Sequence, residues 1–184
     1  DALLVKSRET LLAARNNRPR PHLDDKIITA WNGLMIAGLA RAGSVFDDAD
    51  TIAMAERAAQ FIHDKVCTEP GKGLRRSWRD GEAKIAAFAI DHACLVHGLI
   101  ELHQATLDSR WLKWAVAMQA EMDARCWDTV HGGWCSTPTV SPNTIMRMQG
   151  AYAGAEPSPN SLGSLNLDPL GLLTSPRRLN HKAT

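Results

Sequence analysis

The run of residues 24–43 constrains the fold most, because its pattern is helical and it carries almost no charge on either face. One face is apolar at the i, i+3, i+4, i+7 spacing of a helix: Ile27, Ile28, Trp31, Leu34, Met35, Gly38, Leu39 and Ala42. The opposite face is small, neutral or apolar: Thr29, Ala30, Asn32, Gly33, Ile36, Ala37 and Ala40. We therefore predict a helix covered on both sides, in the centre of a bundle or the inner ring of a helical toroid.

Polar residues are expected at the ends of this helix. Asp24 or Asp25 can cap its first turn, where negative charge is favourable beside the free backbone amides. Gly43 can end it with a left-handed cap. Asp24, Asp25 and Asn32 would then face the cavity that an inner ring surrounds.

Length and charge exclude several classes of protein. A chain of 184 residues is long enough for one domain with a substantial core. A formal net charge of +1 argues against a nucleic-acid partner, which needs clustered Lys and Arg. No apolar run reaches the roughly 18 residues of a membrane span, and no signal peptide is visible. The first residue is Asp rather than Met, so we expect sequence upstream.

The cysteines favour a reduced, cytoplasmic protein without a structural metal. Cys67, Cys94, Cys126 and Cys135 form no Cys-x-x-Cys pair and no zinc-like spacing with His. Cys94 lies in an apolar helical run and is predicted to be a small buried hydrophobe. We expect no cofactor and no metal.

The rest of the chain reads as alternating helices and short extended pieces. Pro19 and Pro21 end the first helix. Asp80-Gly81 predicts a hairpin turn between extended runs at 74–78 and 83–87. Helices are expected at 2–16, 24–44, 49–66, 88–106, 109–126 and 159–173.

Three further expectations concern the C-terminal third. A second extended pair is predicted from 134–137 and 145–148. Pro169 should break or kink the last helix. The polar tail, 175–184, is expected to be frayed.

Marker residues recur at intervals of 60 positions, which indicates an internal repeat. The marker pairs are Gly38 and Gly98, Asp48 and Asp108, Ala55 and Ala115, and Gly73 and Gly133. Each unit comprises an inner helix, a turn with Asp, an amphipathic outer helix, a Gly turn and a short strand pair. The predicted fold is mainly α: about two and a half helical hairpins with short β-hairpins between them.

Several motifs resemble the spermatogenesis-associated protein 20 family, also called thioredoxin domain-containing proteins. They are Arg18 to Lys26 followed by Thr29 to Met35, Trp111-Leu112, Gly132-Gly133, and Gly154 to Ser161. The resemblance implies a fragment of an (α/α)6 toroid similar to those of N-acylglucosamine 2-epimerases and six-hairpin glycosidases. It also implies an upstream thioredoxin-like domain as a partner in the parent protein.

The resemblance divides the chain into a leading helix with a Pro-rich linker (1–23), a partial toroid (24–174) and the tail (175–184). This chain departs from the family in its third inner helix, which contains Pro169, and at two further places. Ile90-Asp91-His92 stands where the family usually has Glu-Asp-Tyr, and 149–153 lacks an acidic stretch. No thioredoxin activity is assigned to these residues, because the redox domain is not among them.

In toroids of this type the ends of the inner helices line the cavity, so the resemblance also implies a site. The candidate catalytic residues are Asp91, Glu156 and His92, since two carboxylates beside a sugar can act as acid and base or as acid and nucleophile. The candidate ligand-binding residues are Asp24, Asp25, Trp31, Asn32, Arg76, Trp78 and Asn160, with the tryptophans stacking on a sugar face.

Structural roles remain open for the same residues. A carboxylate at a helix start can simply be a cap, His92 can be a hydrogen-bonded core residue, and Arg76 can lie on a solvated hairpin edge. Asp91 and Glu156 should point into one shared concavity if a sugar site exists.

The leading functional hypothesis is a toroid that binds or acts on a carbohydrate-like ligand. If it is catalytic, the activity is expected to be epimerase- or glycosidase-like and to need the complete ring. The alternatives are a non-catalytic helical scaffold that docks a redox domain or partner protein, and a truncated inactive copy. No membrane partner is expected.

Overall fold

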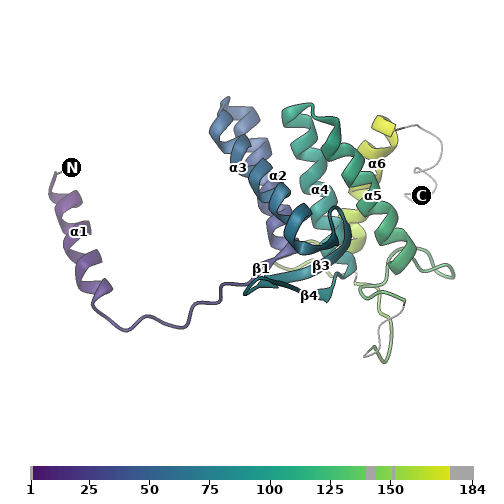
Figure 1. Cartoon of the computed structure of the whole chain (residues 1–184), viewed down its shortest axis with the longest axis horizontal. Helices are drawn as coiled ribbons and strands as arrows, with labels where there is room; N and C mark the ends of the chain where they lie inside the picture. The colour runs from purple at the N-terminus through teal and green to yellow at the C-terminus, as the bar shows by residue number, and fades with distance from the viewer. Residues whose placement is uncertain (1, 140–143, 151, 175–184) are drawn as a thin grey trace.

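Three helices stand side by side and are backed by two others in the computed structural model, which describes residues 2–139, 144–150 and 152–174 (Figure 1). The inner row is α2 (Thr29–Phe46), α4 (Ala89–Thr106) and α6 (Pro159–Thr174). Helix α4 packs against α2 on one side and α6 on the other. The outer helices are α3 (Ala49–Phe61), which packs on α2, and α5 (Ser109–Cys126), which packs on α4.

The repeat of 60 residues is confirmed in the geometry of the two hairpins. Helices α2 and α4 begin 60 residues apart, as do α3 and α5. Asp47 and Leu107 both end their inner helices in the left-handed conformation, with φ of 54° and 56°. Asp48 and Asp108 follow as N-caps whose carboxylates accept backbone N–H bonds from the outer helix.

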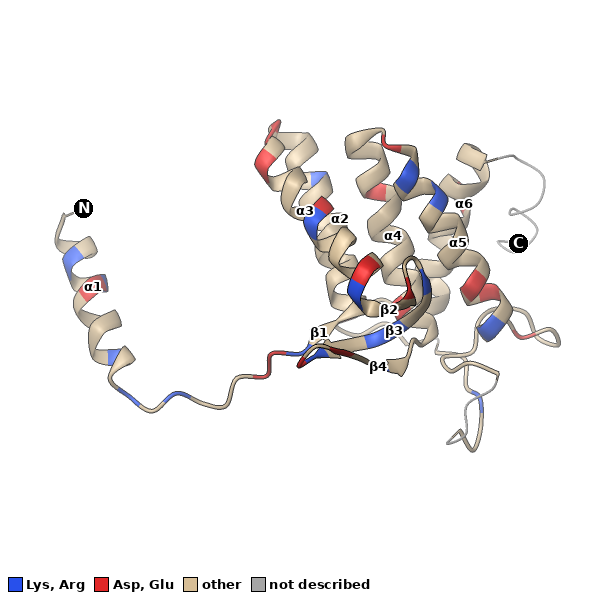
Figure 2. Ribbon diagram, viewed as in Figure 1, with Lys and Arg blue, Asp and Glu red and all other residues tan. Residues whose placement is uncertain are grey.

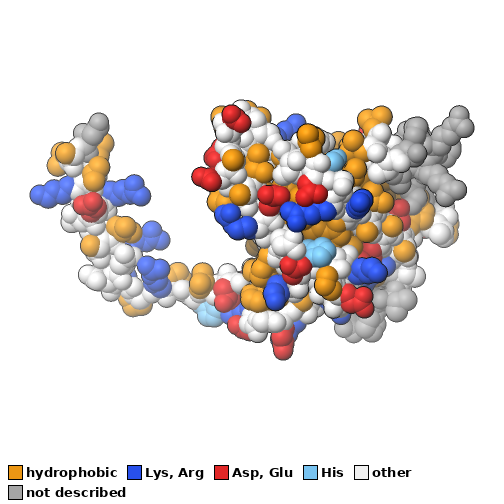
Figure 3. All heavy atoms as spheres, turned by 45° about the horizontal axis from the view of Figure 1, so that its top comes forward, with side chains coloured by type: hydrophobic (Ala, Val, Ile, Leu, Met, Phe, Trp, Pro, Cys, Tyr) orange, Lys and Arg blue, Asp and Glu red, His pale blue; other side chains and the backbone are white. Residues whose placement is uncertain are grey.

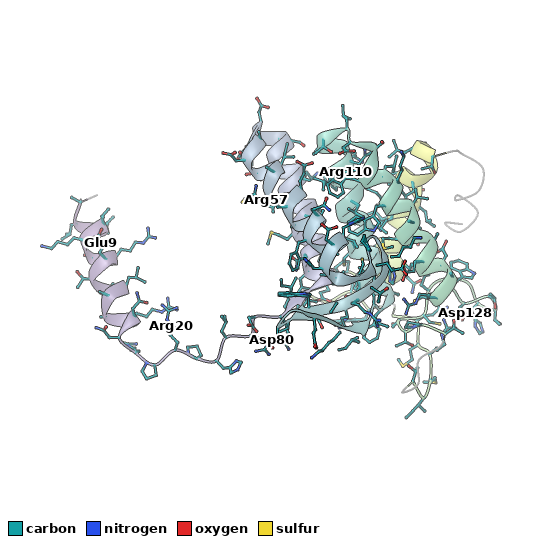
Figure 4. All side chains as sticks on the ribbon, in the orientation of Figure 1. Glu9, Arg20, Arg57, Asp80, Arg110 and Asp128 are labelled. Carbon is teal, nitrogen blue, oxygen red and sulfur yellow. The ribbon has the colours of Figure 1, made fainter. Side chains whose placement is uncertain are left out.

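A small antiparallel sheet lies at the N-terminal ends of the inner helices. Its strands are β1 (Ile27–Ile28), β2 (Cys67–Glu69), β3 (Lys72–Arg79) and β4 (Glu82–Ala86), and β3 pairs with each of the other three. Strand β1 leads directly into α2, and β4 ends just before α4. The predicted hairpin is confirmed, with Asp80 and Gly81 at its turn at φ of 52° and 83°; Figure 4 labels Asp80 there.

The core lies between the inner and outer helices. One cluster joins Ile36 and Leu99 from the inner helices to Trp111 and Met118 from α5. A second surrounds Trp134 between α4, α5 and α6. The predictions that Trp111, Trp114 and Cys94 are buried are confirmed. Figure 2 shows that the ribbons of α2 and α4 are mostly free of charged residues, as inner helices require.

The predicted start and end of the central helix are wrong. The chain stays extended through Ile28 because β1 pairs with Trp78 and Ser77 of β3. Ile28 is therefore the N-cap of α2, without a side-chain cap bond, and Asp24 and Asp25 lie outside the helix. The helix continues past Gly43 to Phe46, and the left-handed residue is Asp47.

The prediction that both faces of α2 are covered is also wrong. Its buried side is the face of small residues, including Thr29, Gly33 and Ala40. Trp31 and Met35, on the face predicted to be apolar and buried, are 60% and 61% exposed. The small face is buried because it lets α4 approach closely. On the other face Leu34 and Leu39 are half-buried against the core, whereas Gly38, like Trp31 and Met35, is exposed.

Three smaller differences concern other segments. The helix predicted at 49–66 has α-helical geometry to Phe61 and then one π-helical stretch, η1 (Ile62–Val66). The extended pair at 134–137 and 145–148 is not a strand pair in the described residues; Trp134 bridges Trp127 instead, and the Ser136 N–H donates to the Met148 carbonyl at 2.7 Å. Pro169 does not interrupt α6. The predicted frayed tail lies outside the described residues.

The first helix, α1 (Ala2–Asn16), lies away from the helical body and is joined to it by an extended linker (Figure 3). All its described residues are exposed, including Leu4, Leu11 and Leu12. Arg20, labelled in Figure 4, lies on the linker and bonds back to Asn16. Within the described part of the chain, no helix is long and apolar enough to cross a membrane.

Candidate functional site at the ends of the inner helices

Two exposed residues meet at the N-terminal end of the inner row. Trp31 lies in the first turn of α2, and its indole N–H donates to the carboxylate of Glu156. Glu156 precedes α6 and is itself exposed. The contact joins segments 125 residues apart, so only the packing of the three inner helices brings the aromatic face and the carboxylate together.

Asp91 lies in the first turn of α4 and is fully buried. Its Oδ2 accepts the Phe88 N–H at 2.9 Å and a guanidinium N–H of Arg76 at 3.3 Å. Burial raises the pKa of Asp91 above its ordinary value, against the opposing effects of the Phe88 amide and the Arg76 charge. The carboxylate therefore holds the end of α4 and the Arg76 side chain in place, and it is not open to a shared hollow.

His92 is buried beside Asp91 and connects α4 to α5. Its Nδ1 lies 3.0 Å from the Phe88 carbonyl and its Nε2 lies 3.6 Å from Glu121. Glu121 also accepts the Gly73 N–H at 3.2 Å and pairs with Arg125 at 2.9 Å. Burial raises the pKa of Glu121, but the contact and charge of His92 and the hydrogen bonds from Arg125 and Gly73 outweigh it and lower that pKa to about 2.

Glu121 and Arg125 are part of this network but were not predicted from the sequence. Their i, i+4 spacing is typical of a surface ion pair on a helix. From the sequence alone they are therefore predicted to be such a pair. The contact from Glu121 to His92 could not be read from that spacing, because it crosses between two helices.

Asp91 and Glu156 influence the same buried thiol. The pKa of Cys94 is raised to about 12, first by burial and then by the charges of Asp91 and Glu156. Asp91 is enclosed at the start of α4, whereas Glu156 is exposed on the segment before α6.

The other predicted site residues fall into two groups. Trp78 and Asn160 have packing roles: Trp78 meets Phe61 edge to face at 5.3 Å, and Asn160 bonds both the N–H and the carbonyl of Trp134, at 2.7 and 2.9 Å. Asn32 donates to the Ile28 carbonyl at 2.9 Å in the first turn of α2.

The two linker aspartates are exposed and form local ion pairs. Asp24 pairs with Lys26 at 3.1 Å, and that hydrogen bond lowers the pKa of Asp24. Asp25 pairs with Arg79 of β3 at 2.8 Å, which attaches the linker to the sheet. Neither lies in the cluster around Asp91, so the structure gathers Trp31, Glu156, Arg76, Asp91 and His92 near the helix ends and leaves the aspartates on the linker.

An exposed indole beside a carboxylate can stack on one face of a polar ring and bond its hydroxyl groups. Glu156 is the accessible carboxylate in this group. Among the described residues, no three His, Cys, Asp or Glu side chains are placed to hold a metal ion.

The fold defines a class: an inner row of parallel helices backed by antiparallel partners is part of an (α/α)6 toroid. Cellobiose 2-epimerases from Bacillus thermoamylovorans and Spirochaeta thermophila match it with TM-scores of 0.69 and 0.63, at 13% and 18% identity. The two matches cover 89% and 86% of this chain, and they cover 44% and 41% of the two epimerase chains. An inactive α-1,6-mannanase variant from Salegentibacter, in complex with α-1,6-mannotriose, matches all of this chain with a TM-score of 0.63 and 12% identity, and 52% of that chain is covered.

The sequence relatives identify the family. Spermatogenesis-associated protein 20 from rat is 36% identical over 175 residues, and the human protein is 35% identical over 174; each match covers 90% of this chain. The resemblance predicted from the motifs is confirmed: the chain corresponds to a segment of the spermatogenesis-associated protein 20 family. It spans about a fifth, 22%, of the curated relatives it matches. No family model matches the chain.

Proposed function

We propose that the toroid to which this chain contributes binds a carbohydrate-like ligand at the N-terminal ends of its inner helices. The single observation that carries the proposal is the hydrogen bond between the exposed Trp31 indole and the exposed Glu156 carboxylate. An aromatic face beside a hydrogen-bonding acid suits a sugar, which has apolar C–H faces and hydroxyl edges. The epimerases and mannanases that share the fold support this ligand class.

Within this proposal the residues have different roles. Glu156 accepts hydroxyl groups or a proton from the ligand, and Trp31 stacks on it. Asp91 holds Arg76 at the edge of the site through their contact of 3.3 Å. Any epimerase- or glycosidase-like reaction rests on Glu156 rather than on Asp91 and His92, which are buried in this chain. It requires the complete ring, because enclosure strengthens the electrostatic interactions that such chemistry uses. We also propose a cytoplasmic location for the parent protein.

The experiment is a titration of the parent protein with glucose, mannose, cellobiose and α-1,6-mannotriose. Binding is followed by tryptophan fluorescence and by calorimetry. A ligand should bind, and Trp31→Ala should weaken binding at least tenfold, since stacking and a hydrogen bond are lost together. Glu156→Gln should weaken it less, because the amide keeps one acceptor. Met35→Ala is the matched control, since Met35 is one turn further on and equally exposed. Binding that is unchanged in Trp31→Ala, or absent for every sugar, contradicts the proposal.

A non-catalytic scaffold that docks a redox domain is the second candidate function. The observation that favours it is the complete burial of Asp91 and His92, whose contacts all stabilise the junction of β3, α4 and α5. A pull-down with the thioredoxin-like domain expected from the family resemblance tests it. Capture that persists in Trp31→Ala, without sugar binding by the parent chain, supports the scaffold.

A further inference from the structure

Two cysteines lie opposite each other where the end of α5 meets the segment before α6. Trp127 and Trp134 form an antiparallel bridge, and beside it the Cys135 N–H donates to the Cys126 carbonyl at 2.9 Å. Asp128, labelled in Figure 4, lies just before the turn that joins the two sides of this bridge. Opposite residues of an antiparallel pair project to the same side, so the register places the two thiols next to each other.

The spacing of such a pair is close to that of a disulfide. Opposite residues at a hydrogen-bonded position have Cα atoms about 5.5 Å apart, within the range of about 4.4–6.8 Å that disulfides span. Their Cβ atoms are about 4.5–5.5 Å apart, and a disulfide needs about 3.5–4.5 Å. A movement of about 1 Å at Cβ therefore brings the two sulfur atoms into bonding distance.

Both thiols are free in the structure and enclosed. Cys126 is fully buried in the cluster around Trp134, and Cys135 is 3% exposed. Burial holds a thiol in its protonated form, whereas the thiolate is the form that reacts. Reaction with an oxidant is therefore slow, and a small oxidant reaches the pair more readily than a bulky reagent.

Cys126 is placed to react second. Burial raises the pKa of Cys126 to about 11, and the charges of Arg125 and Arg147 only partly oppose this. A negative charge on Cys135 raises the Cys126 pKa further, in agreement with the closeness of the two sulfur atoms. Cys135, which retains slight exposure, is therefore the thiol that meets an oxidant first.

We propose that Cys126 and Cys135 form a reversible internal disulfide, with hydrogen peroxide as the oxidant. The Cys135 thiolate attacks one peroxide oxygen and the O–O bond breaks, which gives a sulfenic acid; the leaving hydroxide takes up the thiol proton and becomes water. The Cys126 sulfur then attacks the sulfenic sulfur. The S–S bond forms, the S–O bond breaks, and the hydroxyl group leaves with the Cys126 proton as a second water. Two thiols are oxidised and one peroxide is reduced.

The second step is fast compared with the first, because the partner thiol is already in position. The product connects the end of α5 to Trp134, whose N–H and carbonyl both bond Asn160 in the first turn of α6. The bond closes a short loop in the unfolded chain and so stabilises the folded chain. In a reducing compartment such a disulfide is transient. The inference does not depend on sugar binding, since it rests only on the cysteine pair.

The test is treatment of the native parent protein with hydrogen peroxide, followed by alkylation of the remaining thiols in urea and peptide mapping. Trypsin cleaves after Arg125 and Arg147, so both cysteines fall in the single peptide 126–147. This peptide should lose two hydrogen atoms and take up no alkyl group. Dithiothreitol should restore alkylation at both positions. Met146 lies in the same peptide and is scored separately, because its sulfoxide adds an oxygen.

Two cysteines elsewhere in the fold are internal controls. Cys67 lies on β2 and Cys94 on α4, and each should lose alkylation at least tenfold more slowly than the pair. Urea unfolding gives a second readout: the oxidised protein should unfold at a higher urea concentration than the reduced protein, and dithiothreitol should reverse the increase.

A matched pair of variants tests the order of the steps. Cys126→Ser should leave Cys135 as a sulfenic acid, which dimedone added with the urea will label, and peroxide should then not raise the urea midpoint. Cys94→Ser is the matched control, since Cys94 is also fully buried and loses the same sulfur atom. It should form the 126–135 disulfide at the wild-type rate.

Each outcome decides the proposal. Peptide 126–147 alkylated at both cysteines after peroxide treatment overturns it. So does a disulfide that forms only after unfolding in urea, a bond from Cys126 to another cysteine, or oxidation that adds oxygen to sulfur and is not reversed by dithiothreitol. Circular dichroism shows whether each serine variant folds, and the peptide map of the wild-type protein remains decisive if one does not.

Discussion

Gly33 of α2 and Gly98 of α4 pack backbone to backbone, and a Cβ on Gly98 would lie 2.5 Å from the Gly33 carbonyl oxygen. This approach brings the two inner helices close enough for Ile36 and Leu95 to be fully buried in one cluster. The small residues of α2 are therefore a packing surface, which explains why an uncharged face of mostly small side chains is the buried one.

Gly98→Ala should destabilise the fold by about 1–3 kcal/mol, because an added methyl in a filled core forces the helices apart. Gly38→Ala should instead be neutral or stabilising by up to about 1 kcal/mol, since it improves helix propensity in open space. Urea unfolding of the two variants and the wild type measures both effects. Equal effects at the two glycines would contradict the packing described.

Asp91→Ala should lower the free energy of unfolding by about 2–4 kcal/mol, since it removes a buried partner of Phe88 and Arg76. The lower part of that range is expected, because Arg76 is about one-third exposed and can be hydrated. Asp108→Ala, at an exposed N-cap, is the control and should cost about 1 kcal/mol. A smaller loss at Asp91 than at Asp108 would show that its contacts add nothing beyond capping.

Glu121 should make the free energy of unfolding depend on pH under acidic conditions. Its pKa in the folded chain is lowered from 4.5 to about 2, so its stabilising effect is complete above pH about 5 and is lost as the pH falls toward 2. The shift corresponds to at most about 3 kcal/mol, and solvent screening of the partly exposed side chain reduces this.

The measurement is urea unfolding of wild type and Glu121→Gln between pH 6 and pH 3. The difference between the two proteins should shrink as the pH falls. The raised pKa of Asp91 acts in the opposite direction, because its folded form holds a proton more readily, and it is common to both proteins. A difference independent of pH would argue against the Glu121 contacts.

The cysteines should react slowly with an added thiol reagent in the folded chain. All four are free, and burial is the main reason that the thiol pKa is raised to about 12 at Cys67 and Cys94 and to about 11 at Cys126. Thiolate is the reacting form. Ellman's reagent at pH 8 should therefore modify the native chain at least tenfold more slowly than the urea-unfolded chain. Rapid modification of Cys94 in native protein would show that the start of α4 opens readily.

The sequence pattern was sufficient to predict those features that residues a few positions apart determine. The turn at Asp80-Gly81, the caps at Asp48 and Asp108, and the bounds of α5 depend on contacts within a few positions, and all were predictable. The start of α2 was not, because Ile27 and Ile28 pair with a strand about 50 residues later.

The candidate site shows the same division. Residue types and family motifs placed Asp91, Trp31 and Glu156 at inner-helix ends, but not their contacts. Trp31 reaches Glu156 and His92 lies beside Glu121 only after α2, α4, α5 and α6 have packed.

The sequence by itself determined the helices, the repeat of 60 residues and the order of inner and outer elements, because periodicity and capping act within one turn. Only the tertiary structure decided which face of α2 is buried, that Asp91 is enclosed while Glu156 is exposed, and which charges meet. These depend on close approach between segments distant in the chain, where a missing side chain such as that of Gly33 or Gly98 sets the distance.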